Sequence, residues 1–372
     1  MEGCHMGTIL VPLDGSDMSE RALPFAVRLA RETGGTLLLV RAALAYVYES
    51  ERISDVVRLD HGAQPELDEV AQKVRAMNVT VETSVAHGVS AADSIVGLAC
   101  ERAVDLIVMS SHGRGGLGRF IYGSVADRVL RNAPAPVLMI TGGTHHLWRE
   151  GTIRALMPLD GSALSGRSLL TLGTLARAMS IEAVLLRVIE PPPPDATLGF
   201  PPTYAVPMPM EVDGQVLHAR GALDDEAQRV RGTVPIVGVR VEVGQVAPTI
   251  ATVAAEEKVD LIVMSTHGRG GISRMVMGSA ATAMMQRATV PLLLVPHTVR
   301  TRAVLAPTDP RRRPRPKSDV TVTLTPLQVG YVEYGLEMVL HSADDRASAE
   351  EVQGLLATFE AFAEPSEMVP HT

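Results

Sequence analysis

Short apolar runs alternate with amphipathic segments through the first 297 residues of the chain. An apolar run bounded by glycine or polar residues is typical of a buried strand, and apolar positions three and four residues apart are typical of a helix facing a core. In the first half this pattern predicts strands over 8–13, 36–42, 79–86, 106–110 and 137–140 and helices over 19–32, 64–77, 91–102 and 124–132. Residues 43–61 are expected to form a variable loop that includes at most a helical turn.

The second half repeats the same order of elements. It predicts strands over 153–159, 183–189, 236–243, 261–265 and 292–295 and helices over 164–179, 215–231, 247–257 and 279–288. Residues 191–209 are rich in proline and should form an irregular or extended surface loop. Because the elements alternate strictly and the strands are almost entirely apolar, the fold class is α/β, with parallel sheets covered by helices on both faces.

A 21-residue block is the clearest sign that the two halves are copies. Residues 104–124 and 259–279 match at 15 of 21 positions without a gap. We therefore predict a first domain over 1–144 and a second over 145–297. A basic, proline-rich linker over 298–319 and a strand–helix–helix tail over 320–372 would follow. The tail is short for an independent domain, so it would either pack on the repeats or mediate assembly.

Composition narrows the class of protein. Hydrophobic residues make up 46% of the chain and aromatic residues only 3%, so the cores should be aliphatic. The net charge of −8 argues against a protein that coats nucleic acid or an anionic membrane. No apolar run is long enough for a membrane span, no signal segment precedes the first strand, and two cysteines are too few for a disulfide framework. Cys100 is expected in the core, and a cytoplasmic location is expected for the chain.

The repeated block places a glycine-rich loop between an apolar strand and the start of a helix. Glycine lets the backbone approach a phosphate closely, and free N–H groups at a helix N-terminus favour an anion. Gly123-Ser124 and Gly278-Ser279 stand where such helices should begin, and Arg114 and Arg269 could add positive charge from the loops. An aspartate follows the first strand of each half, Asp14 and Asp160, at the same edge of the sheet, where it could accept a hydrogen bond from a base or ribose.

With these features the chain resembles a tandem universal stress protein. The ATP-binding members of that family carry the motif G-x2-G-x9-G-[ST], and the resemblance covers about 6–142 and 152–297. It implies two doubly wound, five-stranded parallel-sheet domains, each similar to a Rossmann fold, with a nucleotide at the carboxyl edge of each sheet. Both copies depart from the motif at its first glycine, which is Ser110 in the first and Ser265 in the second.

The resemblance also implies a set of binding residues. In the first copy, those bordering adenine and ribose would be Pro12, Asp14 and Ala42, and those along the ribose and phosphates would be Met109, Ser110, Gly113, Gly123, Ser124 and Val125. In the second copy the matching residues are Pro158, Asp160, Val188, Met264, Ser265, Gly268, Gly278, Ser279 and Ala280. The ligand would be ATP, or else ADP or AMP, with or without Mg²⁺ held by its phosphates.

Catalytic residues are not evident in the sequence. His112 and His267 lack a nucleophile and an orienting group at a recognisable spacing, and His145-His146 lack further metal ligands. A regulatory stress-response protein without fast turnover is therefore expected, with slow ATP hydrolysis or autophosphorylation as the upper limit of activity. The alternative is a scaffold that binds no nucleotide and acts through protein partners.

Assembly is suggested by the fifth strand of each half, which is short and apolar. An exposed apolar edge invites pairing, and in this family such strands commonly join two domains. The two halves should therefore pair with each other, and two tandem chains could form a homo-oligomer with the tail at the contact. A protein partner could also bind the tail, whereas nucleic acid and membrane partners are not expected.

Overall fold

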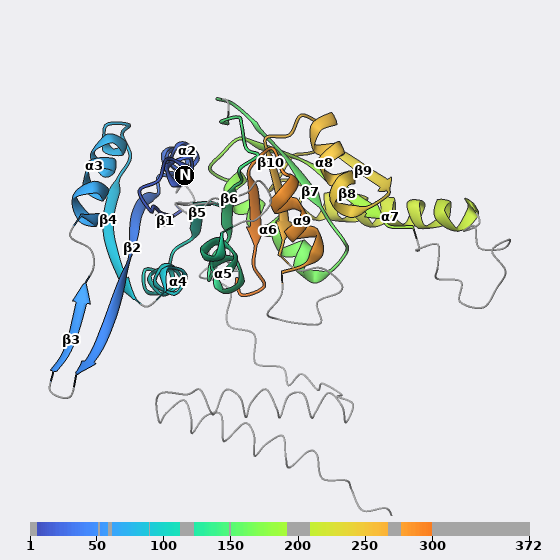
Figure 1. Ribbon diagram of the computed structural model, residues 1–372. Coiled ribbons are helices and arrows are strands. Elements are labelled where there is room, and N and C mark those ends of the chain that lie inside the picture. Colours follow the sequence, from blue (N-terminus) through green and yellow to red (C-terminus); the bar gives the residue numbers. More distant parts are fainter. Residues whose placement is uncertain are drawn as a thin grey trace, which may run out of the picture. The chain divides into compact units, whose positions relative to one another are not determined.

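One sheet of 11 strands runs through both halves of the computed structural model (Figure 1). The structure describes residues 6–50, 53–58, 62–88, 90–111, 123–148, 150–191, 209–266 and 277–299. The predicted tail and all but the first two residues of the predicted linker lie outside these ranges.

The first half contains five parallel strands in the order β4-β2-β1-β5-β6 and an antiparallel strand, β3, beside the far end of β2. Its elements are β1 (Thr8–Pro12), α1 (Asp17–Glu20), α2 (Leu23–Thr33), β2 (Thr36–Ser50), β3 (Ile53–Arg58), α3 (Ala63–Arg75), β4 (Val81–Gly88), α4 (Ala91–Glu101), β5 (Leu106–Ser110), α5 (Ser124–Asn132) and β6 (Val137–Ile140).

The second half has the same strand order, β9-β8-β7-β10-β11, and all four neighbouring pairs are parallel. The predicted doubly wound parallel fold is therefore confirmed. Its elements are β7 (Ile153–Pro158), α6 (Ala163–Ala176), β8 (Ile181–Ile189), α7 (Pro209–Arg229), β9 (Ile236–Val243), α8 (Val246–Glu256), β10 (Leu261–Ser265), α9 (Ser279–Arg287) and β11 (Leu292–Val295).

Helices cover both faces of the sheet because successive strand side chains point to opposite sides. On β2, Leu37 and Leu39 join a core that includes residues of α2, α3 and α6, whereas Leu38 and Val40 join a core with residues of α4, α5, α8 and α9. Both cores are almost entirely aliphatic, as the low aromatic content predicts.

The apolar fifth strands pair with each other, as expected from their exposed edges. β6 and β11 are antiparallel, with Leu138 opposite Leu293. The Thr141 hydroxyl also donates to the Ala288 carbonyl across this junction at 2.8 Å. The sheet therefore continues from one half to the other.

Trp148 fastens the connection between the halves. Its ring meets Phe25 of α2 edge to face at 5.1 Å between centroids, and the Arg28 guanidinium lies 5.9 Å from the ring centroid. On the other side, its indole N–H donates to the Asp260 carbonyl at 2.9 Å. Arg28 also donates to the Gly151 carbonyl at 2.6 Å, so contacts from both halves hold the connection.

Four sequence predictions were wrong in detail. The loop expected over 43–61 contains the end of β2 and its antiparallel partner β3 (Figure 1). The single helix expected over 19–32 is two helices, because Pro24 lacks an N–H and its ring would clash with the carbonyl four residues earlier. Helix α7 begins at Pro209, inside the expected loop, at a position where proline favours helix initiation. Cys100, expected in the core, is exposed on α4.

Candidate functional site

The candidate site of each half lies where the strand order reverses direction. β1 neighbours β5 in the first half, and β7 neighbours β10 in the second. Helices from these neighbouring strands cover opposite faces of the sheet, so a crevice opens between their carboxyl ends. The repeated block contains β5 in the first half and β10 in the second, so both of its copies include a strand that borders the crevice.

Each first strand ends in a tight turn that contains the predicted aspartate. Gly15 and Gly161 have φ of 79° and 77°, a left-handed conformation that favours glycine. The Asp14 carboxylate accepts from the Ser16 N–H at 3.0 Å, and that of Asp160 accepts from the Ser162 N–H at 2.9 Å. The same backbone turn therefore places an aspartate at the crevice in both halves.

The glycines before α5 and α9 differ from Gly15 and Gly161 in their backbone conformation. Gly123 has φ −64° and ψ 149°, and Gly278 has φ −59° and ψ 148°, which any residue can adopt. Among the described residues, the nearest atom to a Cβ on Gly123 would be the Ser111 carbonyl oxygen, at 3.4 Å. Within the same ranges, no side chain caps α5 or α9 at its N-cap position. Glycine at these two positions is therefore not required by a left-handed backbone conformation.

The loop that carries these glycines is anchored identically in the two halves. The Gly123 N–H donates to the Ser111 carbonyl, and the Gly278 N–H donates to the Thr266 carbonyl, both at 2.8 Å. The residues between, 112–122 and 267–276, lie outside the described ranges. The predicted contacts Gly113, Arg114, Gly268 and Arg269 are among them.

Seven of the residues predicted for the second half line one pocket. It is small, about 100 Å³, against roughly 300–1,000 Å³ for typical small-molecule sites, so it would enclose only part of a nucleotide. Asp160 is its one ionisable lining group among the described residues. The predicted residues that line it are Pro158, Asp160, Val188, Met264, Ser265, Gly278 and Ala280.

Ser279 does not line this pocket and is exposed at the first position of α9. The remaining predicted residues occupy the matching places in the first half. Pro12 and Asp14 lie at and just after the end of β1, Ala42 lies on β2, Met109 and Ser110 end β5, and Gly123, Ser124 and Val125 begin α5.

Six residues that line the pocket were not predicted from the sequence. Val246 and Ile250 come from the first turns of α8, Ser165 comes from the start of α6, and Leu159, Thr266 and Ala281 neighbour predicted residues in sequence. Helices that follow strands begin at the carboxyl edge, so the N-terminal turn of each such helix was the available signal.

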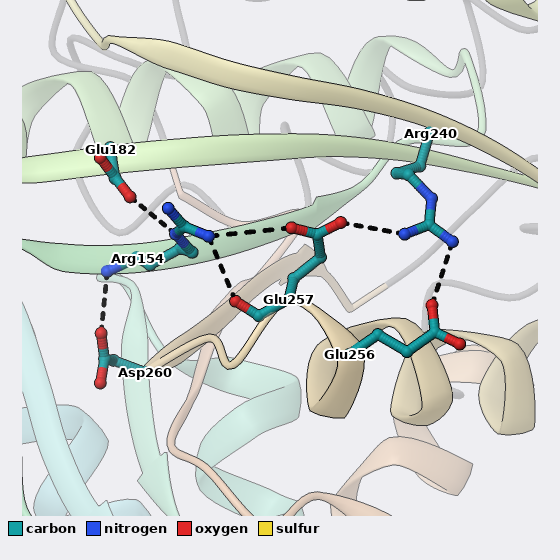
Figure 2. Close-up of polar contacts among 6 residues, drawn as sticks. All are labelled: Arg154, Glu182, Arg240, Glu256, Glu257 and Asp260. Atoms are coloured by element: carbon teal, nitrogen blue, oxygen red, sulfur yellow. Dashed lines mark hydrogen bonds and ion pairs between the residues drawn. The ribbon is translucent and has the colours of Figure 1, made fainter.

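In the second half, an ion-pair network lies toward the amino-terminal ends of the strands, opposite the crevice (Figure 2). Arg154 pairs with Glu182 at 2.6 Å and with Glu257 at 3.8 Å, and Glu257 in turn pairs with Arg240 at 2.9 Å. The Arg240 guanidinium donates hydrogen bonds to Glu242, and then to Glu257 and Glu256, which raise the pKa of Arg240, so it stays charged. This network lies away from the crevice.

The aspartate near the start of each repeated block lies at this same amino-terminal edge of the sheet. Asp260 accepts from the Arg154 N–H at 2.9 Å, and Asp105 accepts from the Gly7 N–H at 2.7 Å. Each ties the start of its strand to the neighbouring first strand.

No group of three or more histidine, cysteine, aspartate or glutamate side chains in the described part of the chain could hold a metal ion. Within the same residues, no helix is long and apolar enough to cross a membrane.

Comparisons with known proteins agree with the tandem organisation. The model of the universal stress protein family matches residues 6–141 and 153–296. A universal stress protein of Mycolicibacterium smegmatis is 25% identical over 299 residues, which cover 77% of this chain and 96% of that protein. A universal stress protein of Methanocaldococcus jannaschii is 32% identical over 139 residues, covering 36% of this chain and 80% of that protein.

Solved structures support the fold. A universal stress protein from Archaeoglobus fulgidus has a TM-score of 0.52 at 18% identity and covers 79% of this chain and 98% of its own. A protein of unknown function from Pseudomonas aeruginosa has a TM-score of 0.56 at 18% identity, covering 78% of this chain and 92% of its own.

Proposed function

Because the chain belongs to the universal stress protein family, we propose that each half binds an adenine nucleotide at the carboxyl edge of its sheet. The observation that carries the proposal is the pocket of the second half, where three separate segments converge. They are the aspartate turn after β7, the end of β10 and the glycine start of α9. The preferred ligand is ATP, with ADP or AMP as alternatives and with any Mg²⁺ held by the phosphates.

The chemistry of the lining suggests how the ligand would be divided among these segments. Val188, Val246 and Ile250 offer an apolar wall suited to one face of adenine. The Asp160 carboxylate can accept from an amino group of the base or a ribose hydroxyl. Phosphates would extend to the start of α9, where uncapped N–H groups and the helix dipole favour negative charge.

The same lining favours binding over fast catalysis. A general base for an attacking water must lie within hydrogen-bond reach of it. Among the described lining residues, Asp160 alone could act so, and it lies at the proposed base and ribose end of the pocket. We therefore propose a regulatory role in the stress response, in which nucleotide occupancy is the signal. A steady-state phosphate-release rate typical of an ATPase would overturn this part of the proposal.

Isothermal titration with ATP tests the binding itself. The full chain, stripped of copurified nucleotide, should bind two equivalents. Gly123→Val and Gly278→Val should each remove one, because the valine fits the backbone angles but fills the space before the helix. Gly97→Ala serves as a control, since its new methyl group meets nothing within 4 Å on α4, and it should leave both sites intact.

Two outcomes would reject the proposal. One is the absence of heat from the stripped wild-type chain at millimolar ATP, which would favour the scaffold that acts through protein partners. The other is unchanged stoichiometry in Gly278→Val and Gly123→Val with unchanged melting temperatures, which would place the nucleotide elsewhere.

We also propose that two tandem chains associate through residues 320–372. The apolar edges of β6 and β11 already pair within the chain, so they are not available for joining two chains. Light scattering on the full chain should give the mass of a dimer, and a monomer at micromolar concentration would contradict this.

A further inference from the structure

A second cavity opens on the other face of the same sheet edge in the second half. Its volume is about 600 Å³, and it lies between β8 and α7. The two cavities are neighbours, because Leu159, Ser165 and Val188 line both of them. Side chains of β8 alternate between faces, and Arg187 lines this cavity but not the nucleotide pocket. Glu190 and, on α7, Asp225 and Glu226 also line it, so the Arg187 guanidinium shares the cavity with three carboxylates.

From this cavity Arg187 reaches the turn that carries the proposed nucleotide-binding aspartate. Its Nη1 donates to the Leu159 carbonyl at 3.0 Å. That carbonyl belongs to the peptide bond preceding Asp160. The Leu159 N–H donates in turn to the Leu186 carbonyl at 2.8 Å. The backbone just before Asp160 is therefore held on both sides, by the strand ladder and by a charged donor.

We infer that Arg187 is a positioning residue for Asp160, acting from the opposite face of the sheet. A hydrogen bond from a charged donor is stronger than a neutral one, and it fixes the plane of the peptide to which Asp160 is attached. Without it, the aspartate turn would sample more orientations, and the carboxylate would meet the nucleotide less often in the productive one. This inference rests on the proposed nucleotide binding at the second site.

The first half supplies a matched control. Arg41 lies 146 positions before Arg187, on the corresponding strand β2, just as Leu13 lies 146 positions before Leu159. Arg41 is 8% exposed, and its Nη2 donates to the Glu66 carboxylate of α3. Within the described part of the chain, its guanidinium is bonded to Glu66 rather than to the Leu13 carbonyl. The same residue type at the same place therefore lacks the contact that matters in the second half.

The test measures ATP affinity at one site at a time. In the full-length Gly123→Val background, only the second site remains, and Arg187→Met should weaken ATP binding there by roughly tenfold. Arg187→Lys should recover part of the loss, because an ammonium group can still donate to the Leu159 carbonyl. In the Gly278→Val background, Arg41→Met should leave the first site within about twofold.

A double-mutant cycle separates positioning from a merely structural effect. If Arg187 acts through Asp160, Arg187→Met should lose most of its effect once Asp160→Asn has already weakened the site. Hydrogen exchange in the nucleotide-free chain gives a second measure. Arg187→Met should speed exchange over 159–162 but not over 13–16, relative to the wild type.

Failure of this inference is distinguishable from failure of the proposed function. No ATP binding by the Gly123→Val parent would reject nucleotide binding at the second site, and the inference with it. Normal binding by that parent with equal affinity in Arg187→Met, or fully additive effects with Asp160→Asn, would reject Arg187 alone. If Arg187→Met does not fold, Arg187→Gln, which keeps a neutral donor, replaces it and should still bind ATP more weakly than Arg187→Lys.

Discussion

Replacing Trp148 measures how strongly the connection holds the two halves together. Trp148→Ala removes three contacts at once. The edge-to-face pair with Phe25 is worth about 0.5–1.5 kcal/mol, the indole hydrogen bond to the Asp260 carbonyl about 1 kcal/mol, and the Arg28 contact about 0.5–1 kcal/mol. The sum predicts a loss of about 2–3.5 kcal/mol in the free energy of unfolding. It includes no separate contribution for the burial of apolar surface, because Trp148 is only partly buried.

Trp148→Phe is the matched variant. A phenyl ring keeps an aromatic partner for Phe25 but has no N–H for the Asp260 carbonyl, so the expected loss is about 1 kcal/mol. Urea unfolding followed by circular dichroism gives both values. The wild-type chain also has a single tryptophan, so its fluorescence reports this junction alone. A loss below about 0.5 kcal/mol for Trp148→Ala would refute the idea that Trp148 fastens the halves.

Four other substitutions give separate checks. Gly143→Ala would place a Cβ 2.5 Å from the Ala288 carbonyl oxygen and should lower the free energy of unfolding by about 1–3 kcal/mol. Gly97→Ala places its methyl group in open space on a helix and should raise it by about 0.5–1 kcal/mol. Equal melting temperatures for the two variants would contradict both expectations. Ser265→Gly restores the family's first motif glycine in the pocket wall and should raise ATP affinity several-fold by titration, while a weaker site would show that the serine hydroxyl contributes to binding. Arg240→Met breaks pairs with three carboxylates and should cost about 1–2 kcal/mol at low salt and less at about 1 M salt, so a salt-independent loss would count against an electrostatic cause.

The strands and most helices were predictable because a single physical signal controls them. A parallel strand covered on both faces must be apolar along its whole length, and such runs end sharply. The predicted bounds of 261–265 and 292–295 are therefore those of β10 and β11. The bounds of the edge strand β9, 236–243, were also predicted, although it includes Arg240 and Glu242. The first helix was mispredicted because helical spacing continues across Pro24 even though the hydrogen-bond ladder cannot.

The extension of β2 was missed for a different reason. Beyond β4, the last residues of β2 pair with β3 among the described strands. The sequences of both segments include polar and charged residues, so they lack the continuous apolar run that marks a strand within a parallel sheet. Arg187 escaped notice because its role depends on a contact between neighbouring strands, Arg187 on β8 to Leu159 after β7. The spacing of residues in the sequence shows which of them lie near the carboxyl edge, but not which side chain bonds to a neighbouring strand there.

Some residues of the repeated block stabilise the fold through contacts in the structure, and others have a role only in the proposed nucleotide binding. Asp105 and Asp260 accept from backbone N–H groups at the amino-terminal edge, so their repetition is explained without any ligand. Gly123 and Gly278 have ordinary backbone angles, so a left-handed conformation does not account for their repetition. Glycine is tolerated as an N-cap residue, and under the proposed function it would also let a phosphate come close to the backbone N–H groups at both helix starts.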